Sequence, residues 1–178
     1  MLLRDKMEKQ KWLEELAEFI VEANTKGWAA GDSEVEPIFS GMKSIYYKRD
    51  NWELRDNYFG YFRAPGFTVV SYKQKPVWSM AYFGPGQTPE QESIVKPTFN
   101  FLRNALMKVP LEMPFRGPSE YSEEDWVYKF KLLRGNITDF LGEEEVLKNG
   151  VLTFAQTIGG GIGIGKNDKR EPIHPWNL

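Results

Sequence analysis

Four short runs of aromatic and β-branched residues follow one another between Ser44 and Phe83, and they constrain the fold more than any other feature. The runs are SIYYKR, WELRDNYFGYFR, FTVVSY and KPVWSMAYF, and the breaks between them are DN, APG and KQ. Residues of the first kind favour strands, whereas Gly, Pro, Asn and Asp favour turns. The segment is therefore predicted to form four consecutive strands, most simply an antiparallel meander.

Two helices are predicted on either side of this segment. In residues 9–24, apolar residues recur at helical spacing opposite a row of glutamates, and the helix is expected to end at NTKG. The second helix is predicted to begin with Thr88 as its N-cap, where Gln91 completes a capping box. It runs to about Val109, and Pro97 inside it should kink it or mark the start of its longer part.

Three further strands are predicted near the C-terminal end of the chain. They read WVYKFKLL, ITDFLGEEEVL and VLTFAQTI, and they follow an extended crossing, PLEMPFRGPSEY. The order helix, four strands, helix, three strands is typical of the α+β class, because nothing alternates as a parallel βαβ fold requires. We expect a curved antiparallel sheet of about seven strands packed on one long helix. Residues 1–178 are predicted to form a single domain, with a core at about 9–164 and a tail at 165–178.

Composition excludes several classes of function. The 23 Lys and Arg residues and 25 Asp and Glu residues give a net charge of −2, so no overall positive field exists for direct binding of nucleic acid. The chain has no cysteine and one histidine, which excludes disulfides and metal sites built from several such ligands, and we expect no metal and no cofactor. No stretch approaches the ~20 apolar residues of a membrane span, which predicts a cytoplasmic protein without a membrane partner.

A glycine-rich stretch, GGGIGIGKN, nearly matches a phosphate-binding loop through Gly160, Gly165 and Lys166. Asn167 stands where a hydroxyl residue would bind magnesium, and the prolines that follow prevent a helix from receiving the phosphates. We therefore interpret the stretch as a strand packed closely on another element. His174, in the tail beyond it, is expected to be solvated.

Alternation along the second predicted strand indicates which of its side chains share a face. Asp56 and Tyr58 point to one side, and Arg55 and Arg63 point to the other, so both faces mix aromatic with polar groups. Such a mixture suits a sheet that encloses a cavity, in which rings supply contact area and a few charges orient a ligand. The alternative is that the same charges are paired on an outer, solvated face.

The fourth predicted strand places Trp78, Met80 and Tyr82 on one face. This ring-rich surface could form either the core or the wall of a pocket. We expect Trp78 to be buried because it belongs to the central strand pattern. Phe101 should also be buried, since it lies on the helix stripe that must cover the sheet.

Charged residues supply the remaining candidates. Asp139 lies in a strand whose neighbours suggest burial, so an inward side chain would need a partner, for which Arg55, Arg63 and Arg116 are available. Arg63 precedes an Ala-Pro-Gly corner, and it is predicted to be partly buried and bonded to a carboxylate or to backbone carbonyls. In GEEEV only the first and third glutamates share a face, which we interpret as solvated.

Three stretches together resemble a family of bacterial and archaeal domains of unknown function. They are FRAPGFTVVSYKQKPVWSMAYFGP, VPLEMPFRGPSEY and GNITDFLGEEEVLKNGVLTFAQTIGGG, and the resemblance spans roughly residues 13–164. The residues that fall on the family pattern are Arg63, Pro65, Gly66, Pro76, Trp78, Tyr82, Pro114, Arg116, Gly117, Pro118, Asp139, Phe140 and Gly142. Domains of this family often follow a helix-turn-helix module in predicted transcription regulators, which implies a sensor-like or accessory domain. Only a short charged lead precedes the first helix here, so a role in DNA recognition would need a separate partner.

The first functional hypothesis is a binding module. The curved sheet and helix would enclose an aromatic pocket for a small organic ligand, with Arg63 and Arg116 available to an anionic group. The predicted ligand-binding residues are Arg63, Trp78, Tyr82, Arg116 and Asp139.

Two other classes of function stay open. The second hypothesis is an enzyme acting on a small anionic substrate, with Asp139 or Glu143 as the base and Tyr82 or Tyr58 as the acid. The third is a structural interaction protein, such as a homodimer formed through an exposed sheet edge. No spacing in the sequence demands catalysis, so the binding module is preferred.

Overall fold

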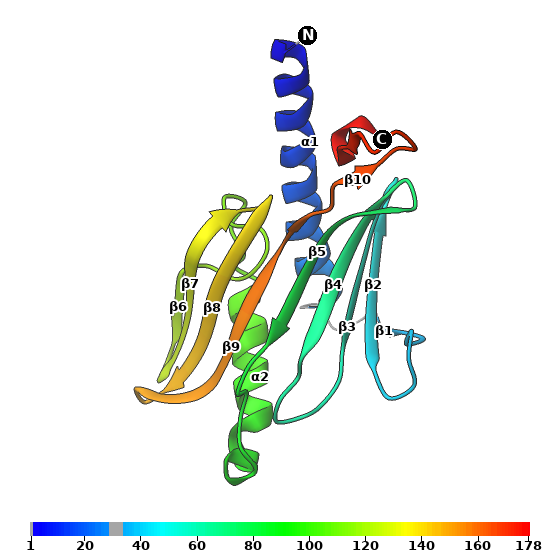
Figure 1. The fold of residues 1–178 in the computed structure, drawn as a ribbon. Coiled ribbons are helices and arrows are strands. Elements are labelled where there is room, and N and C mark those ends of the chain that lie inside the picture. The colour runs from blue at the N-terminus through cyan, green and yellow to red at the C-terminus, as the bar shows by residue number, and fades with distance from the viewer. Residues whose placement is uncertain (1, 29–33) are drawn as a thin grey trace.

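A computed structural model describes residues 2–28 and 34–178 and shows one large antiparallel sheet of nine strands (Figure 1). The strand order across the sheet is β1-β2-β3-β4-β5-β9-β8-β7-β6. The strands are β1 (Glu34–Val35), β2 (Lys43–Arg49), β3 (Trp52–Tyr58), β4 (Gly66–Tyr72), β5 (Lys75–Phe83), β6 (Glu120–Glu123), β7 (Trp126–Asn136), β8 (Asp139–Lys148) and β9 (Val151–Ile162). The predicted α+β class and antiparallel sheet are confirmed.

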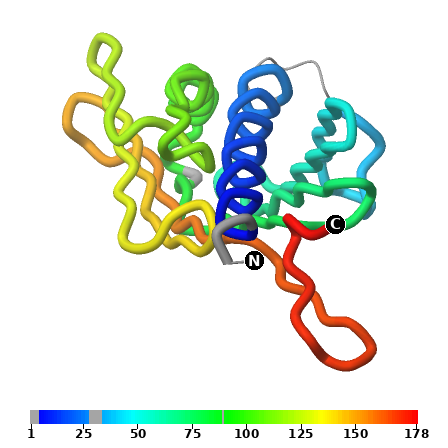
Figure 2. Tube along the Cα trace, turned by 90° about the horizontal axis from the view of Figure 1, so that it is seen from above, coloured from blue at the N-terminus to red at the C-terminus, as the bar shows by residue number. Residues whose placement is uncertain are grey.

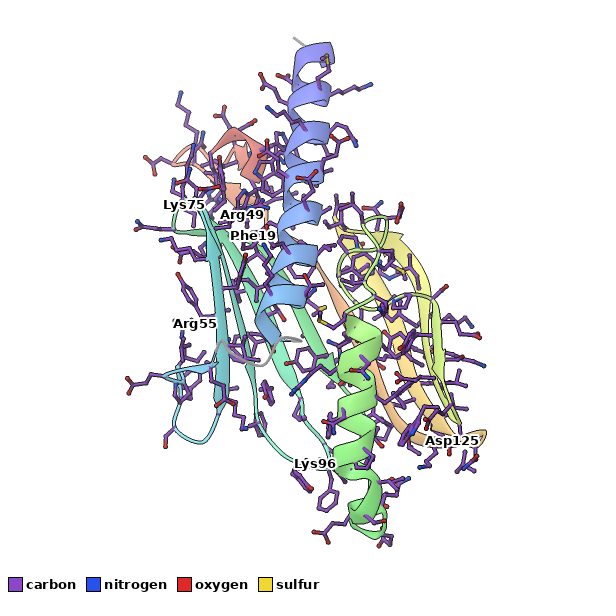
Figure 3. The ribbon with its side chains drawn as sticks, turned by 180° about the vertical axis from the view of Figure 1, so that it is seen from behind. Phe19, Arg49, Arg55, Lys75, Lys96 and Asp125 are labelled. Atoms are coloured by element: carbon purple, nitrogen blue, oxygen red, sulfur yellow. The ribbon has the colours of Figure 1, made fainter. Side chains whose placement is uncertain are left out.

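Two helices lie on the same side of this sheet, which curves around them (Figures 1 and 2). They are α1 (Leu2–Ala23), which continues into the π-helical turn η1 (Asn24–Trp28), and α2 (Glu92–Leu106), which follows the 3₁₀ turn η2 (Pro89–Gln91). The Thr88 backbone N–H donates to Oε1 of Gln91 at 2.9 Å, which is one half of the predicted capping box. The other half is absent, because the Gln91 N–H donates to the Thr88 carbonyl at 2.9 Å and not to its hydroxyl, and the helix begins only at Glu92. Figure 3 views the molecule from the side on which both helices lie, and it labels Lys96 of α2.

The prediction of a single long helix covering the sheet was wrong, and the width of the sheet gives the reason. Nine strands span about 40 Å, whereas a helix is only about 10 Å across. Two helices therefore cover the sheet: α1 packs on β2 and β3, and α2 packs on β7 and β9. The two strands beyond the predicted seven, β1 and β6, are short edge strands without a repeating apolar pattern. Residues 29–33, within a predicted loop, lie outside the described residues.

The glycine-rich stretch begins in β9 where this strand pairs with β5. This pairing joins strands β1 to β5 with strands β6 to β9 in one sheet. A Cβ atom at Gly160 would collide with the carbonyl oxygen of Ser79 and with Cα of Met80. Glycine is needed here because the neighbouring backbone approaches too closely for any side chain. The interpretation as a closely packed strand is confirmed for residues 159–162, which end β9, whereas the rest of the stretch lies beyond this strand.

The core lies between the sheet and the two helices. Trp78 and Phe101 are 2% and 5% exposed, so both predictions of burial are confirmed. In β5 the residues Met80 and Tyr82 are also buried, whereas the alternate residue Ala81 is exposed. The predicted inner face of this strand is therefore the observed one.

The tail is more ordered than expected. A small hairpin of β10 (Gly165–Lys166) and β11 (Pro172–Ile173) leads to a final 3₁₀ turn, η3 (Pro175–Asn177). The ring of Trp176 lies 6.3 Å from that of Trp12 in α1, so the end of the chain returns to the first helix (Figure 2). His174 stacks on Trp176 at 4.5 Å and is half-buried, so the prediction that it is solvated was wrong.

Candidate functional site

A cavity of about 250 Å³ lies between α2 and the inner face of β2, β3, β4, β5 and β9. Its lining residues are Asn24, Lys43, Leu54, Asp56, Tyr58, Gly60, Tyr61, Ala64, Thr68, Met80, Tyr82, Phe99, Leu102, Arg103, Leu106, Arg116, Phe154 and Gln156. Lys43, Gly60, Tyr61 and Arg103 are exposed to solvent, and these residues mark the mouth of the cavity.

Most of the cavity wall is apolar, for two periodic reasons. Alternate residues of the strands face inward, which brings Leu54, Met80 and Phe154 into the wall. On α2, Phe99 and Leu102 are three residues apart and so share one face of the helix. Rings and aliphatic chains therefore supply most of the cavity wall, an arrangement typical of small-molecule sites.

Glu144, on β8, is the centre of a saturated polar cluster beside the cavity. Arg116 donates to both of its carboxylate oxygens, from Nε at 2.7 Å and from Nη2 at 2.9 Å. The Tyr128 hydroxyl donates to Oε1 at 2.9 Å, and Nε2 of Gln156 donates to Oε2 at 2.6 Å. Glu144 is completely buried and the Arg116 side chain is only 12% exposed, so this ion pair is held in a dry environment.

The charges of this cluster shift the pKa values of its members. Burial alone would lower the pKa of the Arg116 guanidinium, but the charge of Glu144 and its hydrogen bonds outweigh burial and raise that pKa. Burial raises the pKa of the Tyr128 hydroxyl well above its ordinary value, and the neighbouring Glu144 adds to the effect. Arg116 therefore stays charged and Tyr128 stays a neutral donor.

Asp56, on β3, forms a second buried polar group that faces the cavity. Its Oδ1 accepts a hydrogen bond from the Thr68 hydroxyl at 2.6 Å. The Tyr82 hydroxyl lies 3.1 Å from Oδ1 and 3.0 Å from Oδ2, so one donor is shared between the two oxygens. Asp56 is 7% exposed, and no lysine or arginine of the described residues forms an ion pair with it.

Burial shifts the pKa of Asp56 as well, but here no ion pair within the described residues outweighs its effect. It raises the pKa of the Asp56 carboxyl, although the hydrogen bonds from Thr68 and Tyr82 and the charge of Arg116 oppose the shift. Burial also raises the pKa of the Tyr82 hydroxyl well above its ordinary value, and the charge of Asp56 contributes further. A carboxyl with a raised pKa in a cavity is a common feature of functional sites.

Residues 56–162 were found to match a known protein family. This segment matches the model of a family described as a domain of unknown function, DUF5680. The match extends over more than half of the chain. The chain belongs to this family. No match was found among curated proteins or among solved structures.

The DUF5680 segment begins at Asp56 and ends at Ile162, the last residue of β9. It contains both buried carboxylates with all their hydrogen-bond partners, α2, and the strands from β4 to β9. It leaves out α1, β2, most of β3 and the tail. The family segment therefore carries the polar wall of the cavity, whereas Lys43 at the mouth comes from outside it.

Of the five predicted ligand-binding residues, the fold brings only Tyr82 and Arg116 to the cavity. The Arg116 guanidinium lies over the Tyr82 ring at 5.5 Å. Trp78 belongs to the core instead, where its Nε1 donates to the Ile137 carbonyl at 2.9 Å. Asp139 is exposed, and its partner is Arg134 at 3.0 Å rather than any of the three arginines considered.

Arg63 was predicted to be partly buried and bonded, and this was wrong. Its side chain is exposed and makes no hydrogen bond or ion pair within residues 2–28 and 34–178. The corner is held by backbone bonds instead: the Gln87 N–H donates to the Phe62 carbonyl at 2.6 Å, and the Phe59 N–H donates to the Pro65 carbonyl at 3.3 Å. No charged side chain is needed where the backbone supplies the contacts.

Sequence reasoning missed Glu144. In GEEEV it paired Glu143 with Glu145, and both of these are exposed as expected, but the glutamate between them faces inward. The signal was present in the alternation, because Phe140 and Val146 lie on the same face as Glu144 and are buried with it. Asp56 was placed on its face correctly but was not chosen as a site residue.

Two other kinds of feature bear on function over residues 2–28 and 34–178. No three acidic, histidine or cysteine side chains gather there in a way that could hold a metal ion. Within the same ranges, neither α1 nor α2 combines the length and apolar character that crossing a membrane would require.

Proposed function

We propose that this chain is a small-molecule-binding domain and that its ligand occupies the cavity between α2 and the sheet. The observation that carries the proposal is the combination of apolar walls with a few convergent, buried polar groups in a cavity of about 250 Å³ that opens at one end. Ligand sites are built in this way, because apolar contacts supply affinity and the polar groups fix orientation. The volume is slightly below the usual ~300–1,000 Å³, so the ligand is compact.

The position of the cavity suits a sensor-like or accessory role. Phe99, Leu102 and Arg103 line it from α2, so a ligand would contact the helix and the sheet together. A ligand can shift a conformational equilibrium only through different contacts with the two states. Binding across this boundary would stabilise one position of α2, which a partner protein, including a separate DNA-binding protein, could recognise.

A pair of tryptophan variants tests where ligands bind. Ala64 lines the cavity near its mouth, and Ala81 is exposed on the outer face of β5. In a thermal-shift screen, a ligand at 100 times its dissociation constant should stabilise the protein by about 2.7 kcal/mol. We expect Ala64→Trp to abolish the shifts produced by ligands and Ala81→Trp to preserve them. Shifts that survive in both variants would place the ligand elsewhere.

A second candidate function, catalysis, is favoured by one observation, the buried Asp56 beside the Tyr82 hydroxyl. The two bases expected from the sequence, Asp139 and Glu143, are exposed and do not line the cavity. Asp56 would take the role of the base, since its raised pKa suits proton transfer better than that of a solvated carboxylate. Mass spectrometry of bound ligands after incubation decides between the two functions. Conversion that is lost in Asp56→Asn would indicate an enzyme, whereas unchanged ligands would indicate a binding module.

A further inference from the structure

The charges around the cavity do not balance. Arg116 and Glu144 neutralise each other through two short hydrogen bonds. Asp56 is the third buried charged residue in this region, and its hydrogen bonds come only from the hydroxyls of Thr68 and Tyr82. If all three groups are ionised, the buried wall carries one unpaired negative charge. A buried charge is costly unless it is paired.

Asp56 also has hydrogen-bonding capacity to spare. An ionised carboxylate can accept about four hydrogen bonds. Oδ2 has a single neighbour, the Tyr82 hydroxyl, which it shares with Oδ1. Because Asp56 lines the cavity, the unfilled capacity is available to a ligand.

Of the two arginines that line the cavity, Arg103 is exposed at the mouth and Arg116, the buried one, is already occupied. Arg116 uses Nε and Nη2 on Glu144, so its charge is paired with that of Glu144. At the mouth, Nζ of Lys43 lies 3.3 Å from Glu34, and both side chains are more than 60% exposed. Exposed charges of this kind are screened by water and salt, so they act weakly on a group deep in the cavity. The expectation of an anionic ligand therefore loses its support.

The apolar walls suit a cation as well. The rings of Phe99 and Phe154 meet edge to face at 5.6 Å, and both line the cavity together with Tyr58. The faces of aromatic rings attract ammonium groups, most strongly away from water. A cavity that combines a carboxylate with aromatic rings in its wall is therefore a favourable place for an organic amine.

We infer that the cavity takes an organic cation, a protonated amine that donates hydrogen bonds to Oδ2 of Asp56 while its compact apolar or aromatic body packs between α2 and the sheet. This inference rests on the proposed function and names its ligand class. The raised pKa of Asp56 is consistent with it, since burial without a positive partner disfavours the ionised carboxylate and a bound ammonium would restore it.

Three probes of similar shape test the charge of the ligand: benzylamine, benzyl alcohol and benzoate. Affinities are measured by calorimetry at neutral pH on the full chain. We expect benzylamine to bind about tenfold or more tightly than benzyl alcohol, because only the amine pairs the buried charge. Benzoate should bind most weakly.

A matched pair of variants tests the role of Asp56. Asp56→Asn keeps the shape of the side chain and removes its charge. It should lower the affinity for benzylamine about tenfold and leave the affinity for benzyl alcohol nearly unchanged. Asp139→Asn makes the same change at an exposed carboxylate outside the cavity, and it should alter neither affinity. Lys43→Met removes a positive charge at the mouth of the cavity and leaves the core unchanged. It should raise the affinity for benzylamine about two- to threefold.

The outcomes separate this inference from the proposed function. Equal affinities for the amine and the alcohol, tighter binding of benzoate, or amine binding that is insensitive to Asp56→Asn would overturn the inference and leave the binding function standing. Binding of none of the three probes would also overturn it. The binding function itself falls only if the wider screen yields no ligand that Ala64→Trp blocks.

Discussion

Glu144 and Asp56 are both buried carboxylates on the inner face of one sheet, and their surroundings differ. Glu144 receives hydrogen bonds from Arg116, Tyr128 and Gln156, and one of these partners carries a compensating charge. Asp56 receives hydrogen bonds only from two neutral hydroxyls. The first group has no capacity left for a ligand, whereas the second has an open acceptor and, when ionised, an unpaired charge.

This difference assigns separate roles to the two regions. Complete satisfaction in a low-dielectric setting makes a polar network rigid and specific, so the Glu144 cluster acts as a structural lock between β8, β9 and the crossing that carries Arg116. Incomplete satisfaction next to a cavity leaves Asp56 as the group that a ligand would complete.

The largest effect is expected from Arg116→Met, which removes the positive half of the lock and leaves Glu144 buried without a partner. Breaking a buried ion pair in this way should lower the free energy of unfolding by about 3–5 kcal/mol. Chemical denaturation measures the loss. Arg63→Met is the matched control, because Arg63 is exposed and should lose less than about 0.5 kcal/mol. Similar losses in both variants would contradict the structural role of the Glu144 cluster.

A smaller effect is expected from Tyr128→Phe. Its hydroxyl donates to Glu144 at 2.9 Å and accepts the Gly117 N–H at 3.2 Å, so the variant leaves two buried groups short of a partner. The expected cost is about 1–2 kcal/mol. Tyr82→Phe, the matched change beside Asp56, should cost less than about 1 kcal/mol, because Asp56 retains Thr68 and can take up a proton. A larger loss from Tyr82→Phe would reverse the assignment of roles.

The pH dependence of stability should also separate the two regions. The pKa of Asp56 is raised in the folded state, so between the unfolded pKa, about 3.8, and the folded one the native protein binds more protons than the unfolded chain. The stabilisation from this group is therefore present at low pH and is lost as the pH rises toward the folded pKa, with a slope of at most about 1.4 kcal/mol per pH unit. Comparing unfolding of the parent and Asp56→Asn between about pH 4 and 8 isolates this slope. A difference between them that does not change with pH would show that Asp56 titrates normally.

The smallest effect is expected at the corner before β4. Arg63→Lys should change stability by less than about 0.5 kcal/mol, because the corner is held by backbone hydrogen bonds and not by the guanidinium. Thermal unfolding of this variant beside the parent is sufficient. A clear drop in melting temperature would mean that Arg63 has a role which its exposure conceals.

Local periodicity accounts for what could be predicted of the fold. Strands alternate with period two and helices with a period of 3.6 residues, and both patterns can be read from neighbouring residues. Seven strands, both helices, and the inward faces that carry Trp78, Tyr82 and Phe101 followed from these patterns. The short strands β1 and β6 were missed because two and four residues are too few to show a period.

Neighbouring residues along the chain were enough to predict the fold class and the faces of the strands, and they pointed to Tyr82 and Arg116, which line the cavity. Which charged side chains contact one another depends on the tertiary structure. Arg116 and Glu144 are 28 positions apart, and Asp56 and Tyr82 are 26 apart. Burial and pairing at such separations depend on how β3, β5, β8 and the crossing between α2 and β6 come together. Arg63 and Arg116 therefore look alike as sequence, yet one is solvated and the other is locked in the core, because desolvation is a property of the assembled sheet and helices.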